Sequence, residues 1–351
     1  MTKSPNAPSI LVIYTGGTIG MMKDPDTGSL TPFNFDTLYK HIPILESIDC
    51  RITSYSFDPL IDSSNMKPAF WIRLAGVIEV NYDKYDGFVV LHGTDTMAYT
   101  ASVLSFMLEN LNKPVVLTGS QLPMGVIRTD GRDNFINAIE IAAARENGKA
   151  LIPEVCICFE NNVMRGNRTS KFNAENFNAF LSGNYPILAK VGVHIKYNDQ
   201  YIRVPSENNL VVHKNLDPGV AILKLFPGIT ENVVCSILSI AGLKAVILET
   251  YGAGNAPTDK WFIEALKKAI DSGITIFNVT QCKGGSVEMG KYETSLYLES
   301  IGVVGGYDIT TESAIAKLMF LLGQGHTASN LKHLLETPLA GELTVEPITN
   351  H

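Results

Sequence analysis

The chain alternates between short, continuous apolar runs and longer stretches in which apolar residues recur every three or four positions. The continuous runs predict buried strands at 10–14, 87–91, 114–117 and 154–159. The periodic stretches predict amphipathic helices at 68–82, 97–111 and 130–144. Strands that alternate with helices in this way are typical of a mainly parallel sheet with helices on both faces. We therefore predict an α/β fold.

The alternation is interrupted in the second half of the chain. From 193 to 217 the pattern is irregular, and strands are expected again at 220–225, 245–248 and 274–279. A length of 351 residues also favours two domains. We predict a larger N-terminal α/β domain over 1–200, a linker over 201–217 and a smaller C-terminal α/β domain over 218–351.

Composition excludes several classes of protein. The net charge is −7 and no basic tract is present, which disfavours nucleic-acid binding. No apolar run reaches the ~18 residues that a membrane span needs. The N-terminal residues lack the apolar core of a signal peptide. The cysteines form no CxxC pair, which is typical of a reducing compartment; they are Cys50, Cys156, Cys158, Cys235 and Cys282. We expect a cytoplasmic protein with neither a membrane nor a nucleic-acid partner.

The strand predicted at 87–91 leads into the polar turn His92-Gly93-Thr94-Asp95-Thr96 and then into a helix. Thr94 or Asp95 is expected to cap that helix. The turn places a hydroxyl and a carboxylate at the carboxyl end of a strand, where α/β sheets bind ligands. His92 directly follows a buried strand, so we interpret it as structural.

Further polar residues follow other strands. Thr15-Gly16-Gly17-Thr18 comes after the first strand, and Lys171 ends a polar, basic segment after a later one. The chain has no GxSxG, HExxH or P-loop motif and no metal-ligand spacing. A threonine nucleophile needs a base, and a lysine held by an aspartate can accept a proton if burial lowers its pKa. Singly, a Thr-Asp turn and a lysine are ordinary structural features; together they indicate proton-transfer chemistry.

Several motifs occur in order along nearly the whole chain: TGGTIG, LHGTDTMAYTAS, TGSQLP, RGNRTSK, YGAGNAP and VTQC. Together they resemble the L-asparaginase family of the asparaginase/glutaminase superfamily, and most closely its cytoplasmic, type I branch. The resemblance implies an amidohydrolase that converts L-asparagine to L-aspartate and ammonia. It also implies that no metal or organic cofactor is needed.

The resemblance assigns roles to individual residues. Thr18 becomes the nucleophile that forms an acyl-enzyme, and Thr94, Asp95 and Lys171 become the proton-transfer group. Asp95 also accepts the α-ammonium group of the substrate. The complete substrate-binding set implied by the resemblance is Gly17, Asp62, Ser63, Ser64, Gly93, Thr94, Asp95, Gln121 and Asn255.

The resemblance also implies that two residues of the predicted C-terminal domain contribute to the site. Many relatives carry a tyrosine on the loop after TGGT, but the corresponding MMKDPDTGSLTP contains none. Some cytoplasmic relatives supply a tyrosine from the C-terminal domain, and Tyr292 is the candidate here. Asn255 matches a family position that reaches the active site of a neighbouring subunit. The resemblance therefore implies a homodimer or homotetramer.

Other functions remain open at this point. The same site could serve a glutaminase-asparaginase or the amidase subunit of a tRNA-dependent amidotransferase. The latter usually has an additional N-terminal domain, whereas nine residues precede the first predicted strand. A non-catalytic amino-acid sensor is disfavoured because Thr18, Thr94, Asp95 and Lys171 are all present.

Overall fold

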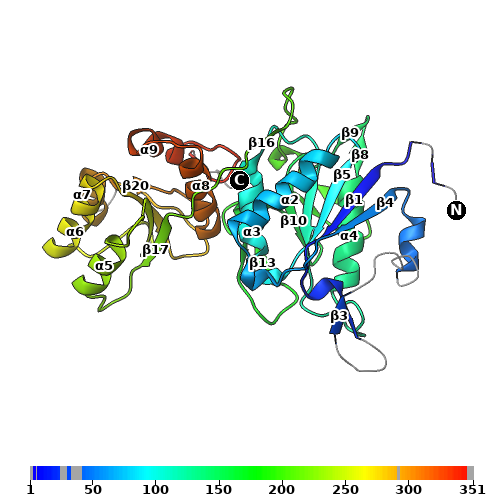
Figure 1. Cartoon of the computed structure of the whole chain (residues 1–351), viewed down its shortest axis with the longest axis horizontal. Coiled ribbons are helices and arrows are strands. Elements are labelled where there is room, and N and C mark those ends of the chain that lie inside the picture. The colour runs from blue at the N-terminus through cyan, green and yellow to red at the C-terminus, as the bar shows by residue number, and fades with distance from the viewer. Residues whose placement is uncertain (1–2, 5, 24–29, 33–41, 291–292, 346–351) are drawn as a thin grey trace. The chain divides into compact units, whose positions relative to one another are not determined.

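The computed structural model describes residues 3–4, 6–23, 30–32, 42–290 and 293–345. The chain divides into two compact units, Met1–Lys214 and Asn215–His351. Each unit is built around its own sheet with helices on both faces (Figure 1). The predicted α/β fold is therefore confirmed.

The described part of the first unit holds an eight-stranded sheet in the order β15-β14-β11-β10-β7-β5-β1-β4. Its strands are β1 (Ser9–Tyr14), β4 (Arg51–Ser56), β5 (Gly87–Leu91), β7 (Val115–Thr118), β10 (Val155–Phe159), β11 (Asn162–Arg165), β14 (Ala189–Lys190) and β15 (Lys196–Tyr197). The five strands from β10 to β4 in that order are parallel. The other three extend one edge in antiparallel pairs. Consequently, the carboxyl ends of β1, β4, β5 and β7 lie at the same edge of the sheet.

Helices cover both faces of this sheet, and its central strands β5, β7 and β10 are buried along their whole length. On one face, α4 (Gly131–Ala143) packs Phe135 and Ile139 into a core that includes Val12 and Val89. On the other face lies α3 (Met97–Met107), against which α2 (Pro68–Asn81) packs (Figure 1). The helix α3 starts directly after the turn at the end of β5, so it connects Thr94 and Asp95 in that turn to the packed interior.

Short elements complete the first unit. The strand pairs are β2 (Met21–Lys23) with β3 (Leu30–Pro32), β6 (Leu108–Glu109) with β16 (Val211–Val212), β8 (Arg145–Glu146) with β9 (Lys149–Ala150), and β12 (Ser170–Lys171) with β13 (Phe180–Leu181). Short 3-10 turns are found at Thr18–Gly20, Pro43–Ser47, Ser63–Asn65, Thr94–Thr96, Gly166–Arg168 and Asp199–Tyr201. The strand β16 belongs to the segment predicted as a linker, and its pairing with β6 places that part of the segment on the first unit.

The second unit has a four-stranded parallel sheet in the order β17-β18-β19-β20 within its described residues. The strands are β17 (Val220–Lys224), β18 (Ala245–Thr250), β19 (Thr275–Thr280) and β20 (Val304–Gly305). One face packs on α5 (Glu231–Leu238) and α6 (Lys260–Asp271). The other packs on α8 (Thr311–Gly323) and α9 (Ala328–Glu336); α7 (Glu293–Ser300) lies between β19 and β20 in sequence.

Candidate active site

The turns that follow β1, β4 and β5 are in close contact. A Cβ atom added at Gly16 would lie 2.1 Å from the Ile61 carbonyl oxygen, and one at Gly17 would lie 2.5 Å from the Gly93 Cα. A Cβ at Gly93 would in turn meet the Ser63 Oγ at 2.5 Å. Gly16 and Gly17 also have φ values of +131° and +89°, which side-chain-bearing residues rarely adopt. Glycine is therefore required for three polar turns to meet at one place.

Thr18 begins the 3-10 turn that follows these glycines. Its side chain is half-buried, whereas the next residue, Ile19, packs fully into the core. Thr15, at the start of the turn, is buried and donates from Oγ1 to the Leu91 carbonyl oxygen at 2.9 Å. Within the described part of the chain, no hydrogen bond occupies the Thr18 hydroxyl. Thr18 is therefore held by the backbone around it, and its hydroxyl stays available.

Lys171 joins the two residues predicted to act with it. Its Nζ lies 2.8 Å from Thr94 Oγ1 and 2.7 Å from Asp95 Oδ1. The lysine side chain is 16% exposed and the aspartate side chain 67% exposed. An ammonium group only donates hydrogen bonds, so Thr94 Oγ1 accepts from Lys171 and directs its own hydrogen elsewhere. The acceptor is Gln121 Oε1, at 3.4 Å.

The expected capping of α3 by Thr94 or Asp95 is wrong. The residue before the helix is Thr96, and no side-chain capping bond is formed. Thr94–Thr96 instead forms a separate 3-10 turn, and Thr96 Oγ1 donates to the Ser63 carbonyl oxygen at 2.8 Å. The physical reason is that the N-cap position falls on Thr96, one residue after Asp95, and that Asp95 Oδ1 pairs with Lys171 at 2.7 Å.

The chain segment that places Lys171 beside Asp95 includes an antiparallel strand, which a purely parallel sheet would not contain. The chain turns back after β10 into the antiparallel β11, passes through the turn Gly166–Arg168 and reaches Lys171 on β12. That turn packs against α3, where a Cβ added to Gly166 would lie 3.1 Å from the Ala101 Cβ. Because α3 begins just after Asp95 and also packs against the turn that leads to Lys171, one helix sets the positions of both residues.

The turn after β4 carries the residues predicted to hold the α-amino-acid end of a substrate. Asp62 Oδ1 accepts hydrogen bonds from the Ser64 amide at 2.9 Å and from Ser64 Oγ at 2.8 Å. These two bonds lower the pKa of Asp62, so its carboxylate stays ionised. Asp62 and Ser64 are exposed, whereas Ser63 is buried against Gly93. The turn therefore offers a carboxylate and a hydroxyl to solvent beside Thr94.

Gln121 is fixed from two directions. Its Nε2 donates to the Asn176 carbonyl oxygen at 3.1 Å, which leaves Oε1 facing Thr94. Its backbone amide donates to both carboxylate oxygens of Asp130, at 3.1 and 3.0 Å. Asn134 of α4 donates to the Gly119 carbonyl oxygen at 3.0 Å. Sequence reasoning missed Asp130 and Asn134, although an acidic residue at the start of a predicted helix is a recognisable signal.

His92 is structural, as interpreted from the sequence. It is fully buried: Nδ1 donates to the Gly93 carbonyl oxygen at 2.7 Å, and Nε2 accepts from Thr100 Oγ1 at 2.9 Å. Trp71 Nε1 donates to the same Thr100 hydroxyl at 2.9 Å. This chain of bonds requires a neutral imidazole protonated on Nδ1, and burial lowers the pKa of His92 to about 4.

The low pKa of His92 predicts a specific acid sensitivity. The ordinary pKa of histidine is 6.5, so the unfolded chain binds the proton more readily than the folded chain as the pH falls. Folding stability is therefore lost between pH 6.5 and about pH 4. The contribution to the free energy of unfolding is about 3 kcal/mol. Urea unfolding of the protein and of His92→Gln between pH 7 and 4 measures it. In His92→Gln the free energy of unfolding should depend less on pH than in the parent, whereas replacement of the exposed His194 by Gln should leave the pH dependence unchanged. Equal slopes for all three proteins would contradict the assignment.

Two of the predicted residues do not belong to the described part of the first unit. Asn255 ends the Tyr251–Asn255 turn after β18, in the second unit. Tyr292 lies outside the described residues. The roles predicted for both therefore stay predictions.

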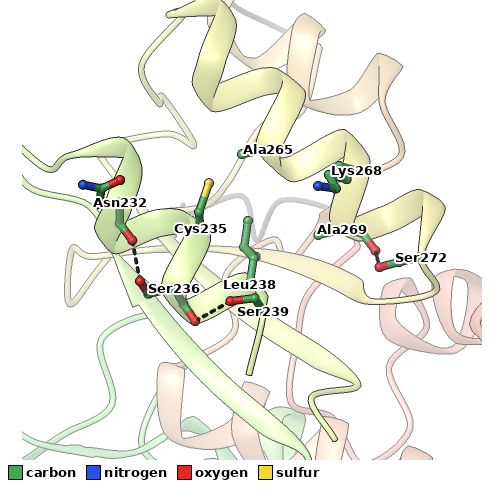
Figure 2. Close-up of a pocket in the computed structure, with 9 residues that line it drawn as sticks. All are labelled: Asn232, Cys235, Ser236, Leu238, Ser239, Ala265, Lys268, Ala269 and Ser272. Carbon is green, nitrogen blue, oxygen red and sulfur yellow. Dashed lines mark hydrogen bonds between the residues drawn. The ribbon is translucent and has the colours of Figure 1, made fainter. Parts of the chain in front are cut away.

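A pocket of about 400 Å³ lies between α5 and α6 of the second unit (Figure 2). Its lining includes no carboxylate. Its three serine hydroxyls, on Ser236, Ser239 and Ser272, each donate to a helix carbonyl oxygen. Cys235 and Lys268 also line it, without an acid partner in the lining. The pocket therefore lacks the paired groups that proton transfer needs.

Metal binding and membrane insertion receive no support from the described residues. No group of three or more His, Cys, Asp and Glu side chains suited to a metal ion occurs among them. Within the same part of the chain, no helix combines the length and apolar character needed to cross a bilayer.

The fold and the site define a class of protein: a two-unit α/β protein in which a lysine contacts a threonine and an aspartate at the carboxyl edge of a mainly parallel sheet. Residues 9–203 match the family model of the asparaginase N-terminal domain. Residues 219–335 match that of the glutaminase/asparaginase C-terminal domain. The chain therefore belongs to the asparaginase family.

Individual relatives span both units. The chain is 43% identical over 341 residues to L-asparaginase 1 of Escherichia coli (strain K12), which covers 96% of this chain and 98% of the relative. It is 42% identical over 359 residues to the 60 kDa lysophospholipase of Mus musculus, covering 96% of this chain but 62% of that longer protein. The crystal structure of L-asparaginase I from Vibrio cholerae superposes with a TM-score of 0.87 at 40% identity, covering 96% and 99% of the two chains.

Proposed function

We propose that this protein is an L-asparaginase, an amidohydrolase that converts L-asparagine to L-aspartate and ammonia through an acyl-enzyme on Thr18. One observation carries the proposal: Lys171 contacts both Thr94 and Asp95, beside the glycine turn that presents Thr18. Membership of the asparaginase family and full-length similarity to proteins named L-asparaginase support the choice of substrate.

The contacts suggest how the reaction proceeds. The Thr18 oxygen attacks the side-chain amide carbon. Lys171, in its uncharged form, takes up the Thr18 proton through the Thr94 hydroxyl and passes it to the departing nitrogen, which leaves as ammonia. Water then attacks the resulting ester, loses a proton to the same group, and releases L-aspartate as Thr18 regains its hydrogen. Asp95 orients the lysine at 2.7 Å throughout. The threonine supplies the nucleophile, so we propose that neither a metal nor an organic cofactor takes part.

The positions of two carboxylates support the binding of an amino-acid substrate. Two carboxylates, Asp62 and Asp95, are exposed on neighbouring turns and can accept a substrate α-ammonium group. Gly17 and Gly93 allow the neighbouring turns to pack closely, and we propose that backbone N–H groups of these turns face the substrate. We propose that Ser63, Ser64 and Gln121 complete the pocket in this unit. Carboxylates favour an amino-acid substrate over an uncharged amide.

The proposal predicts a preference among small amides. We expect ammonia release from L-asparagine to exceed that from L-glutamine, because one extra methylene places the amide carbon away from a fixed Thr18. An assay coupled to ammonia detection, with each substrate over the same concentration range, measures kcat/KM for both. Dialysis against a chelator should leave both rates unchanged. Equal rates with the two substrates would favour a glutaminase-asparaginase, and no release from either would favour an amino-acid sensor.

We also propose that the protein self-associates as a homodimer or homotetramer and acts in the cytoplasm. The family resemblance supports an assembly in which Asn255 contributes to the site of a neighbouring subunit. Free cysteines are typical of a reducing compartment, and all five here are free. Sedimentation analysis and an activity assay of Asn255→Ala together test the proposed self-association. Loss of activity in an oligomer of unchanged size supports it, and full activity contradicts it. For Tyr292, replacement by Phe tests the predicted proton-transfer role.

A further inference from the structure

The last residue of β1 lies beneath the turn that carries Thr18. Tyr14 is 1% exposed, and its phenol donates a hydrogen bond to the Gly20 carbonyl oxygen at 3.0 Å. Burial raises the pKa of Tyr14 to about 12, so the phenol keeps its hydrogen and remains a donor at neutral pH. The residue on one side of the TGGT motif therefore binds the backbone on the other side.

Gly20 is shaped to receive this side chain. A Cβ added to it would lie 2.1 Å from Tyr14 Cζ and 2.4 Å from the phenol oxygen. Its φ is not in the left-handed region, so glycine is required here for close approach rather than for backbone conformation. The ring of Tyr14 and the backbone of Gly20 therefore fit together with no space for any other residue at position 20.

The two contacts enclose Thr18. Before it, Gly16 and Gly17 pack against the neighbouring turns; after it, Ile19 is buried and Gly20 is bound by the phenol. We propose that Tyr14 is a positioning residue, whose phenol holds the Thr18–Gly20 turn so that the Thr18 hydroxyl points at the substrate amide. The inference rests on the proposed function, because it takes Thr18 as the nucleophile.

Physical magnitudes distinguish positioning from simple stabilisation. A buried carbonyl that loses its donor costs about 1–3 kcal/mol, so without the phenol the turn shifts to find another partner. A displacement of about 1 Å at a reacting group can cost roughly 10²-fold in rate. The carboxylates proposed to bind the substrate, on Asp62 and Asp95, belong to other turns, which the loss of one phenol leaves in place.

The first test replaces the phenol by a benzene ring. Tyr14→Phe should lower kcat by roughly tenfold or more, with KM within about threefold of the parent. Rates are measured after urea unfolding has given the folded fraction of each protein. The matched control is Tyr197→Phe on β15, a partly buried tyrosine in the same sheet, which should keep its kcat. If the kcat of Tyr14→Phe stays within twofold of the parent, the inference is wrong. It is also wrong if the loss disappears once the folded fraction is taken into account.

A second variant approaches the contact from the other side. Gly20→Ala should lower kcat at least as much, because its Cβ would overlap the Tyr14 ring. Its control is Gly76→Ala on α2, where an added Cβ meets nothing within 4 Å. Parent-like kcat in Gly20→Ala would overturn the inference. Thr18→Ala, run in parallel, separates the two proposals: if it is inactive while Tyr14→Phe and Gly20→Ala are unaffected, the proposed function stands and the positioning role falls.

Discussion

Thr18→Ala is expected to abolish amide hydrolysis while leaving the fold intact. The variant loses the oxygen that forms the acyl-enzyme, and the expected loss of kcat is on the order of 10³-fold or more. The fold should survive because the Thr18 hydroxyl makes no hydrogen bond within the described residues, so its removal leaves no buried partner unsatisfied. Ammonia release measures the first expectation, and urea unfolding measures the second.

Thr15→Val provides a matched control in the same turn. It removes the hydroxyl that donates to the Leu91 carbonyl oxygen, but that oxygen also accepts the Thr15 amide at 3.0 Å. We therefore expect a loss of stability of about 1 kcal/mol and no comparable loss of kcat. Activity of Thr18→Ala within about tenfold of the parent would instead place the nucleophile elsewhere, with Thr94 as the next candidate.

The strand–turn–helix around Thr94 could be predicted because its signals are local. A continuous apolar run predicts β5, a change to helical periodicity predicts α3, and polar residues occupy the junction. The rule that ligands bind at the carboxyl ends of parallel strands then places Thr18 and Thr94 at one edge. Geometry adds the contact between Gly17 and Gly93, which no local pattern encodes.

The path to Lys171 could not be predicted in the same way. The alternation of strands and helices predicts a mainly parallel sheet, but it does not show that β11 is antiparallel to β10 or that the lysine reaches Asp95 through a turn packed on α3. The capping error has a related cause, since the residue that pairs with the Asp95 carboxylate lies 76 positions along the chain. Local propensity predicts elements well, but it cannot weigh a long-range ion pair against a local hydrogen bond.

Lys171→Met and Asp95→Asn should each lower kcat/KM severely, and the double variant should be hardly worse than the worse single variant. The Lys171 Nζ contacts Asp95 at 2.7 Å and Thr94 at 2.8 Å, so the three groups form one path for a proton. Each single change interrupts that path, with an expected loss of roughly 10²–10⁴-fold. Once it is interrupted, a second change removes little more, because groups that act as one unit are not additive.

A second lysine–aspartate pair shows whether the effect comes from chemistry or from charge. Lys267 and Asp271 on α6 lie 2.9 Å apart, with side chains 55% and 62% exposed. Lys267→Met and Asp271→Asn should leave the rate unchanged, because an exposed pair of this kind contributes only about 0.3–0.5 kcal/mol to stability. The decisive measurement is the coupling in kcat/KM between Lys171 and Asp95. If their two losses multiply in the double variant, the residues act independently, and Asp95 then serves substrate binding rather than proton transfer.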